Sequence, residues 1–210
     1  MKSIKKIMLV ALTAILSISY TSAQVGIQAG YSASINTDNE IALSGFHVGP
    51  VYNLSIQGPI SLQYGLLYNY MFKETTGTIL GVTGSSKTTA HKLDIPVRVA
   101  ASFPFGNGLS AFVFGGPNFN FGLSQVTSGT TDFWGLGTVY TEGENIYKLE
   151  MSDGKKRFSP FDLQLGAGAG IQFNQLSLRF SYDWGMLDRD NSDNRVWKNN
   201  DMKIGIAYSF

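Results

Sequence analysis

MKIGIAYSF, residues 202–210, alternates strictly between two kinds of side chain. One face of an extended chain carries Met202, Ile204, Ile206, Tyr208 and Phe210, and the other carries Lys203, Gly205, Ala207 and Ser209. Alternation with a period of two predicts a β-strand with one apolar face and one small or polar face. The same pattern recurs in seven earlier stretches, so we predict eight strands: 25–35, 45–56, 60–73, 91–103, 109–122, 160–173, 175–185 and 201–210.

These stretches have the length of membrane-spanning strands. A tilted strand needs about 9 to 11 residues to cross a bilayer, and a closed barrel satisfies every backbone hydrogen-bonding group there. Alternation alone also fits a soluble barrel such as a lipocalin, whose apolar side chains point inward. The polar face is, however, rich in glycine, which weakens a strand in water but suits a narrow lumen. We therefore predict an all-β fold, an eight-stranded antiparallel up-and-down transmembrane β-barrel.

The predicted connections alternate in length. The long ones are 36–44, 74–90, 123–159 and 186–200, and the short ones are 57–59, 104–108 and 174. An even number of strands places all long loops at one end and both termini at the other. Bacterial outer-membrane barrels with short periplasmic turns have this arrangement. The predicted location is therefore the outer membrane of a Gram-negative bacterium, with the long loops outside the cell.

The first residues have the features of a signal peptide. Three lysines precede the apolar run 7–18, and Thr21 and Ala23 are small residues suited to a cleavage site. We expect residues 1–23 to be cleaved on export and residues 24–210 to form the barrel. Cleavage removes three of the 16 basic residues and none of the 15 acidic ones, so the formal charge changes from +1 to −2. This balance does not indicate a nucleic-acid partner, and the absence of cysteine excludes a disulfide framework or a lipidated cysteine.

Charged residues occur on the face predicted to point into the lumen. In a narrow barrel, such groups must be paired or hydrated, so we expect them to pair across the interior and seal it rather than line a conducting path. We expect Arg98 and Arg179 to form the central constriction with Asp94, Asp162 or Asp183. The whole predicted lumen charge network consists of Lys73, Lys92, Asp94, Arg98, Asp162, Arg179, Asp183 and Lys203.

Aromatic residues gather near the predicted strand ends. Two such belts are expected at the two interfaces of a bilayer. The predicted interface aromatics are Phe103, Phe173 and Phe210 at the end with short turns, and Phe46, Phe72, Phe121, Phe161 and Trp184 at the end with long loops.

The sequence offers no recognisable catalytic or metal-binding set. Both histidines, His47 and His91, are assigned to the inward face near the long loops, where a polar lumen lining explains them as well as a hydrolase would. A set of His91 with Ser85, Ser86 or Asp94 has no recognisable spacing. The run DRDNSDN at 188–194 departs from a calcium loop at Ser192, Asp193 and Asn199, and we interpret it as a solvated acidic loop. We predict no enzyme, no catalytic residues, no metal and no cofactor.

Three prolines, Pro50, Pro96 and Pro117, fall inside predicted strands. Proline cannot donate to a β-ladder, so we expect a weak seam where Pro96 and Pro117 lie at one level. The seam is either a bulge or a lateral opening for a lipid-like molecule. Because face alternation continues through both sites, we expect no net slip of register.

Several stretches resemble one family of proteins. These are LDIPVRV at 93–99, GGP at 115–117, FDLQLGAGAGIQF at 161–173, LSLRFSYDWG at 176–185 and AYSF at 207–210. They are similar to the outer-membrane β-barrel domain family common in Bacteroidetes, which includes PorT-like and OmpA-like small barrels. The resemblance implies an outer-membrane location and supplies no catalytic residues.

The predicted role is that of a small structural or interaction protein that acts through its extracellular loops. The alternatives are a narrow channel or transporter of small or hydrophobic molecules, and a lipid-acting enzyme. The expected partners are outer-membrane lipids and lipopolysaccharide, and the barrel-assembly machinery through the strand ending in Phe210. Loop 123–159 is the candidate surface for a partner, glycan or lipopolysaccharide, or is simply a loop with added β-hairpin structure. We expect a monomer.

Overall fold

The computed structural model describes residues 23–37, 42–192 and 196–210, so most of the predicted signal peptide lies outside the described residues. Most of the described chain is β-structure. The strands are β1 (Ala23–Asn36), β2 (Ala42–Gln57), β3 (Ile60–Gly65), β4 (Leu67–Ile79), β5 (Val82–Gly106), β6 (Leu109–Phe133), β7 (Thr138–Thr141), β8 (Phe161–Phe173), β9 (Leu176–Gly185) and β10 (Asn199–Ser209). One short 3₁₀ helix, η1 (Ile146–Lys148), follows β7. Among the described residues, no helix has the length and apolar character that a membrane span needs.

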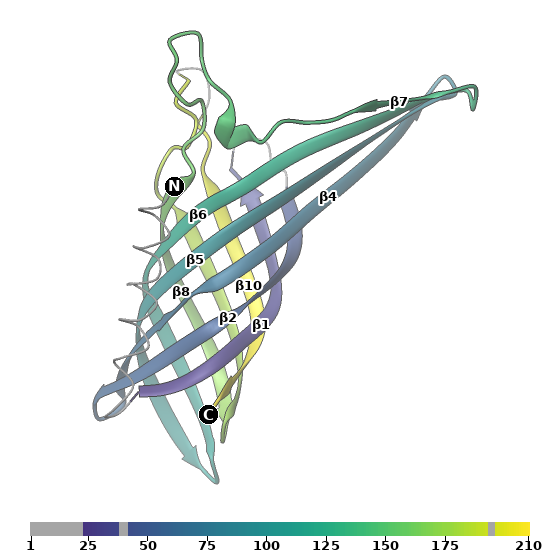
Figure 1. Cartoon of the computed structure of the whole chain (residues 1–210). Coiled ribbons are helices and arrows are strands. Elements are labelled where there is room, and N and C mark those ends of the chain that lie inside the picture. The colour runs from purple at the N-terminus through teal and green to yellow at the C-terminus, as the bar shows by residue number, and fades with distance from the viewer. Residues whose placement is uncertain (1–22, 38–41, 193–195) are drawn as a thin grey trace.

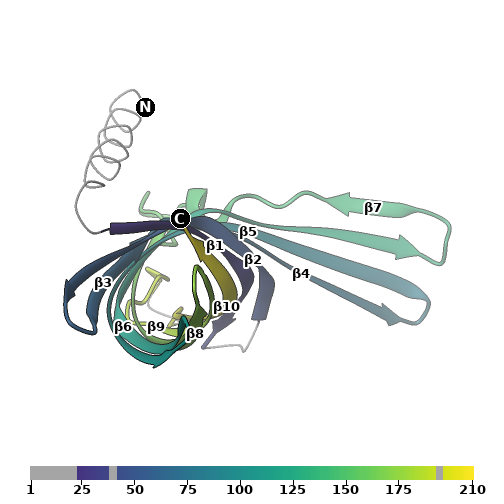
Figure 2. The ribbon, with the colours of Figure 1, turned by 90° about the horizontal axis from the view of Figure 1, so that it is seen from below.

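The strands close into a ring of antiparallel neighbours (Figures 1 and 2). Strand β1 pairs with β2 on one side and with β10 on the other, which joins the two ends of the sheet. Strands β3 and β4 are two halves of one barrel strand, interrupted at Leu66. Counting them as one, the ring has eight strands in chain order, and the predicted up-and-down barrel is confirmed.

Side chains alternate between the two faces of the wall as the sequence predicts. Along β10, Asp201, Lys203, Gly205 and Ala207 are buried in the interior, whereas Ile204, Ile206 and Tyr208 are exposed on the outside. A soluble barrel would show the opposite distribution, with its apolar residues inside. The structure therefore agrees with a barrel whose outer wall contacts lipid.

Three strands continue far beyond the ring. Strands β4, β5 and β6 project from the end that carries the long connections, and β7 pairs with the outer part of β6 (Figures 1 and 2). The prediction that 74–90 is a loop was therefore wrong, because only Leu80 and Gly81 form a turn there. Both have positive φ, of 51° and 84°, as a two-residue hairpin turn requires. We call the part formed by 73–90, 124–133 and 138–142 the projecting sheet.

The three prolines in strands coincide with gaps in the ladders. Pairing of β5 with β6 stops after Pro96 and Asn118 and resumes at Val99 and Gly115. The register is the same on both sides of the gap, so the expected absence of a net slip is confirmed. Near Pro50, the neighbouring strand is interrupted at Leu66, whose N–H donates to the Pro50 carbonyl at 3.0 Å. We call this line of interrupted pairing the proline level.

Candidate functional site

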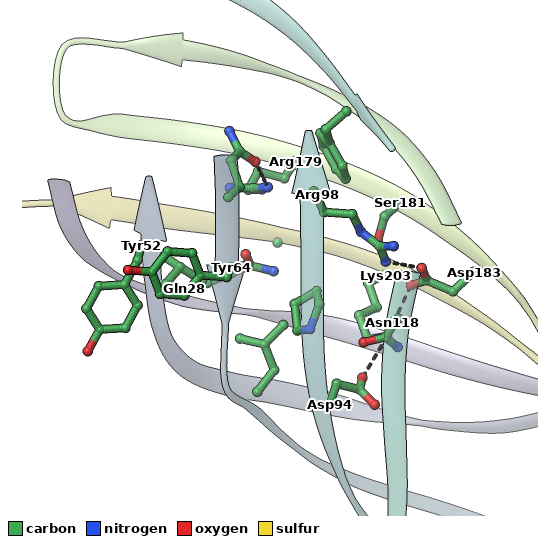
Figure 3. Close-up of a pocket in the computed structure, with 16 residues that line it drawn as sticks. Gln28, Tyr52, Tyr64, Asp94, Arg98, Asn118, Arg179, Ser181, Asp183 and Lys203 are labelled. Atoms are coloured by element: carbon green, nitrogen blue, oxygen red, sulfur yellow. Dashed lines mark hydrogen bonds and ion pairs between the residues drawn. The ribbon is translucent and has the colours of Figure 1, made fainter. Parts of the chain in front are cut away.

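The centre of the lumen holds a cluster of paired charges (Figure 3). Lys203 on β10 lies between two carboxylates, with its Nζ 2.9 Å from Asp94 Oδ2 on β5 and 3.5 Å from Asp183 Oδ2 on β9. Arg98 pairs with the other oxygen of Asp183 and also donates to the carbonyl of Gly116. All four charged side chains are buried. Three strands of the wall are thus joined across the interior by one network.

Small residues in the wall make room for this cluster. A Cβ atom at Gly166 would collide with the Asp183 carboxylate and lie 2.9 Å from Arg98 Nη2. The glycine-rich inner face predicted from the sequence therefore has a local cause here, because the charged side chains occupy the space that a larger residue would need.

A second pair lies closer to the loop end of the barrel. Lys92 donates to Ser34 Oγ at 2.6 Å and lies 3.5 Å from Asp201 Oδ1. Asp201 also accepts a hydrogen bond from Gln164 Nε2 at 3.1 Å. Asp201, the first residue of the last predicted strand, was not among the predicted lumen charges. It lies two residues before Lys203 and therefore on the same face, and this parity could have identified it.

Arg179 lies apart from the carboxylates. Its Nη2 donates to Gln63 Oε1 at 2.6 Å, and its guanidinium carbon lies 4.8 Å from the ring centre of Phe114 and 5.4 Å from that of Phe112. The hypothesis that Arg179 forms the central constriction with a carboxylate is therefore wrong. The Arg179 guanidinium instead contacts two aromatic rings and the Gln63 amide. Lys203 occupies the central position that was predicted for Arg179.

Two further residues of the predicted network have other surroundings. Lys73 is only half-buried at the base of the projecting sheet and forms no ion pair with the described residues. Asp162 is 0% exposed, yet neither of its oxygens accepts a hydrogen bond from the described part of the chain. It lies opposite Asn120 in the β6–β8 ladder. The structure thus buries Asp162 as predicted but places no described cation within 4 Å of it.

The two histidines lie on opposite faces of the wall. His47 is buried in the lumen, where its ring nitrogens are hydrogen-bonded to Gln28 at 3.0 Å and to Ser32 at 2.9 Å. His91 was assigned to the inward face, which is wrong: it follows the outward parity of β5, one residue before Lys92, and contacts Tyr68 and Tyr70. Because inward and outward residues alternate, a catalytic set of His91 with the inward Asp94 does not form.

The cavities left in the lumen are small. One of about 40 Å³ lies beside Arg98 and Lys203, and one of about 30 Å³ lies near Arg179. A third, of about 140 Å³, lies near Trp197 at the loop end.

The loops at this end pack into a cap, formed by residues 145–160, 186–192 and 196–198. Arg189 is 1% exposed and donates to the Ser159 carbonyl at 3.1 Å and to the Tyr147 hydroxyl at 2.7 Å. Phe158 packs edge-on against Trp197, with ring centres 5.2 Å apart. The interpretation of 188–194 as a solvated loop was wrong for Arg189 and Asp190, which are both buried. Residues 193 and 194 lie outside the described residues.

One hairpin of the cap carries an exposed ion pair. Lys156 Nζ lies 2.5 Å from Glu150 Oε1, and the two residues also form a β-bridge. The hydrogen bond and the positive charge of Lys156 lower the pKa of Glu150. Within the described residues, no group of acidic, histidine or cysteine side chains is arranged to hold a metal ion.

Most of the predicted interface aromatics lie on the outer wall. The exposed ones are Phe46, Phe72, Phe103, Phe173, Trp184 and Phe210. Phe121 and Phe161 are half-buried and pack against each other, with ring centres 5.2 Å apart. They lie opposite each other at the end of the β6–β8 ladder.

Comparisons with known proteins give one family match and several similar solved structures. A family model described as outer membrane protein beta-barrel domain matches residues 9–191. No curated protein matches significantly. Among solved structures, Neisserial surface protein A is similar with 10% identity and a TM-score of 0.47, and the attachment invasion locus protein Ail of Yersinia pestis with 15% and 0.39. A major outer membrane protein from Thermus thermophilus has 15% identity and a TM-score of 0.45. Each comparison covers 90% of this chain and 100% of the other.

Proposed function

Because the chain belongs to the outer membrane protein beta-barrel domain family, we propose that it is a closed barrel that anchors an interaction surface at the outside of the cell. The interaction surface consists of the projecting sheet and the loop cap, which both lie at one end of the barrel (Figure 1). Outer-membrane barrels of bacteria carry their long connections on the extracellular side. Residues 1–23 are the cleaved signal peptide in this proposal.

The cluster of paired charges in the lumen is the observation that carries the proposal. The central cluster of Lys203, Asp94, Asp183 and Arg98 joins three strands of the wall across the interior. Each of these charges would have to lose its partner before ions could pass, and unpaired buried charges are costly. A barrel filled in this way has no evident use for its interior other than stability, which leaves its outer end as the working part.

Planar bilayer recording tests the closed lumen. We expect the purified barrel to give no steady single-channel current, whereas a variant in which Lys203, Arg98 and Asp183 are all replaced by serine gives measurable steps. The triple variant is the control that shows insertion and detection. Large, steady currents from the unmodified protein would contradict the proposal and favour a channel.

The proline level supports a second candidate, a transporter of small hydrophobic molecules through the barrel wall. Pairing between β5 and β6 is interrupted there, and the cavity of about 40 Å³ beside Arg98 is lined by Pro96. Uptake of a small apolar dye into liposomes that contain the protein would favour this function. Replacing Pro96 by valine restores a donor to the ladder and should then slow the uptake.

The partners that follow from the proposal are those of a surface-exposed barrel. Lipid and lipopolysaccharide surround the outer wall, and the barrel-assembly machinery binds the last strand, which ends in Phe210. The barrel is a monomer and not an enzyme. If it were a lipid-acting enzyme, it would show turnover of phospholipid or lipid A that is lost on replacement of His47 or His91.

Crosslinking on intact cells tests the interaction role. A photoreactive residue placed at Thr78, near the tip of the projecting sheet, should capture an external molecule, whereas the same residue at Ser177 inside the barrel should not. Both variants should still show the heat-dependent shift in electrophoresis that marks a folded barrel. Equal capture at both positions would contradict the role.

A further inference from the structure

One face of the projecting sheet carries a hollow with a volume of about 460 Å³. The strand register builds it from two rows of side chains. In the first row, Glu74 on β4 lies opposite Lys87 on β5, and Lys87 lies opposite Ser128 on β6. This row continues toward Glu142, which follows β7.

The second row is built in the same way. Ser85 on β5 lies opposite Thr130 on β6, and Thr130 lies opposite Tyr140 on β7. Because each row is offset from the other by two residues on every strand, both rows point to the same side of the sheet. The hollow is therefore a groove that runs across four strands, with hydroxyl groups along its floor. We call it the hydroxyl groove.

The aromatic ring of Tyr140 borders the groove and is 79% exposed. Tyrosine provides a large, rigid contact surface with little loss of side-chain entropy, and its ring face carries partial negative charge. No ring contact with another described aromatic residue holds Tyr140. The ring is thus free to take a ligand on its face.

The charges of the groove favour some ligands over others. Glu74 and Glu142 are exposed and form no ion pair with described residues, although Lys87 is the cross-strand neighbour of Glu74. Two carboxylates against one ammonium repel a polyanion, such as a sulfated or phosphorylated chain. Much of the exposed surface of the groove is carbon, which suits the C–H faces of a sugar, but the charged side chains of Glu74, Lys87 and Glu142 border it and would lose water to an acyl chain.

We propose that the hydroxyl groove binds an uncharged oligosaccharide. The C–H groups on a sugar face carry partial positive charge and pack on the ring of Tyr140. Sugar hydroxyls donate to the carboxylates of Glu74 and Glu142 and exchange hydrogen bonds with Ser128 and Thr130. Sites for small ligands commonly combine one aromatic surface with a few convergent polar groups in this way. The inference rests on the proposed function, because it gives the chemistry of a ligand for the projecting sheet.

Titration of the purified full-length protein in detergent tests the groove. The probes are three neutral hexasaccharides, of α-linked glucose, β-linked glucose and β-linked N-acetylglucosamine, and a heparin hexasaccharide as the polyanionic control. Calorimetry or two-dimensional NMR is expected to show saturable binding of at least one neutral probe and no binding of heparin. Tyr140→Ala is expected to weaken this binding by about tenfold, the size of one lost aromatic contact.

Matched variants separate the groove from the rest of the sheet. Tyr140→Phe keeps the ring and should retain most of the binding, whereas Glu74→Gln and Glu142→Gln, combined, should weaken it. Thr78→Ala changes an exposed residue near the hairpin tip, outside the groove, and should have no effect. Unchanged folding is checked for each variant by the heat-dependent shift in electrophoresis.

Three results would overturn the inference. They are saturable binding of heparin alone, an absence of binding by every neutral probe, and equal binding by the protein and Tyr140→Ala. If a photoreactive residue at Thr78 captures a protein on cells while no neutral probe binds, the proposed interaction role is supported and the proposed sugar site is refuted. If no molecule is captured and no probe binds, both fall.

Discussion

Replacing Lys203 by methionine should destabilise the barrel strongly, because it removes the shared cation of two buried carboxylates. Lys203 Nζ lies 2.9 Å from Asp94 and 3.5 Å from Asp183. At an effective dielectric constant of about 20, charges at these distances attract by about 6 and about 5 kcal/mol. Most of this attraction offsets the cost of removing three charges from water. The net effect is therefore much smaller than the sum.

The groups that stay behind set the expected magnitude. Removing one partner of a buried ion pair costs about 3 to 5 kcal/mol. Asp183 keeps Arg98, and Asp94 keeps its hydrogen bonds from Asn69 at 3.0 Å and Asn120 at 2.5 Å. We therefore expect the lower end, a loss of about 3 kcal/mol in the free energy of unfolding, or about a hundredfold in the equilibrium constant.

The assay is urea unfolding of the protein folded into lipid vesicles, followed by tryptophan fluorescence. Lys155→Met is the matched control, because Lys155 forms an exposed ion pair with Asp153 at 3.3 Å and such pairs contribute only about 0 to 1 kcal/mol. Adding Asp94→Asn to Lys203→Met should recover about 1 to 2 kcal/mol, since it removes the uncompensated charge. A loss below about 1 kcal/mol for Lys203→Met, or no recovery in the double variant, would refute the reasoning.

Three further predictions concern the wall and the cap. Gly45→Ala should destabilise the barrel by about 1 to 3 kcal/mol in the same urea assay, because the added Cβ would lie 2.7 Å from a Cα of the neighbouring strand. Gly77→Ala should be neutral, because the space around Gly77 is open. Arg189→Ala should speed tryptic cleavage of the cap by about tenfold, since it removes two charge-assisted hydrogen bonds within the cap, while the electrophoretic shift of the barrel stays unchanged. Equal cleavage rates would show that these hydrogen bonds do not hold the cap together. The pKa of Glu150 is lowered in the folded protein, so its ion pair with Lys156 should persist at neutral pH and be lost only as the pH falls through that lowered pKa. An NMR titration of Glu150 measures this pKa. A titration midpoint at or above 4.5 would refute the prediction.

The barrel could be predicted from the sequence because two independent signals agree in it. Face alternation fixed which residues of a strand such as 201–210 point inward, and the short turns fixed how the strands connect. Charged positions inside the barrel followed from the same parity, and Asp94, Asp183 and Lys203 are buried there as expected.

The projecting sheet could be predicted only in part, because added β-hairpin structure was one alternative for 123–159 whereas 74–90 was predicted to be a loop. Its strands are rich in threonine and serine on both faces, as in 82–90, so no apolar alternation marks them. Threonine favours β-structure through its branched Cβ, but a polar stretch between two barrel strands looks like a loop. Pairing with neighbours, including the hydrogen bond of 3.0 Å between Thr78 and Thr83, makes it a sheet.

The sequence also could not predict which side chains the charged lumen residues contact. Parity places Arg179 inside, but only the fold brings it over Phe114 rather than beside a carboxylate. The burial of Arg189 depends on contacts with Ser159 and Tyr147, which lie far from it in the sequence. The inward assignment of His91 was wrong because Lys92, the next residue of β5, faces the lumen. Neighbouring residues of a strand face opposite sides, so His91 faces outward.

Strands β5 and β6 each run for 25 residues from the short turns to the projecting hairpins, and the β5–β6 ladder has a β-bulge at His91 and Lys92, where the projecting sheet begins. The nine residues 82–90 alone reach about 30 Å past the ring at about 3.3 Å per residue. A pull on the tip is therefore carried along covalent chain and ladder hydrogen bonds straight into the wall. The projecting sheet should therefore transmit force from its tip to the wall of the barrel, and the bulge at His91 and Lys92 is where we expect it to bend.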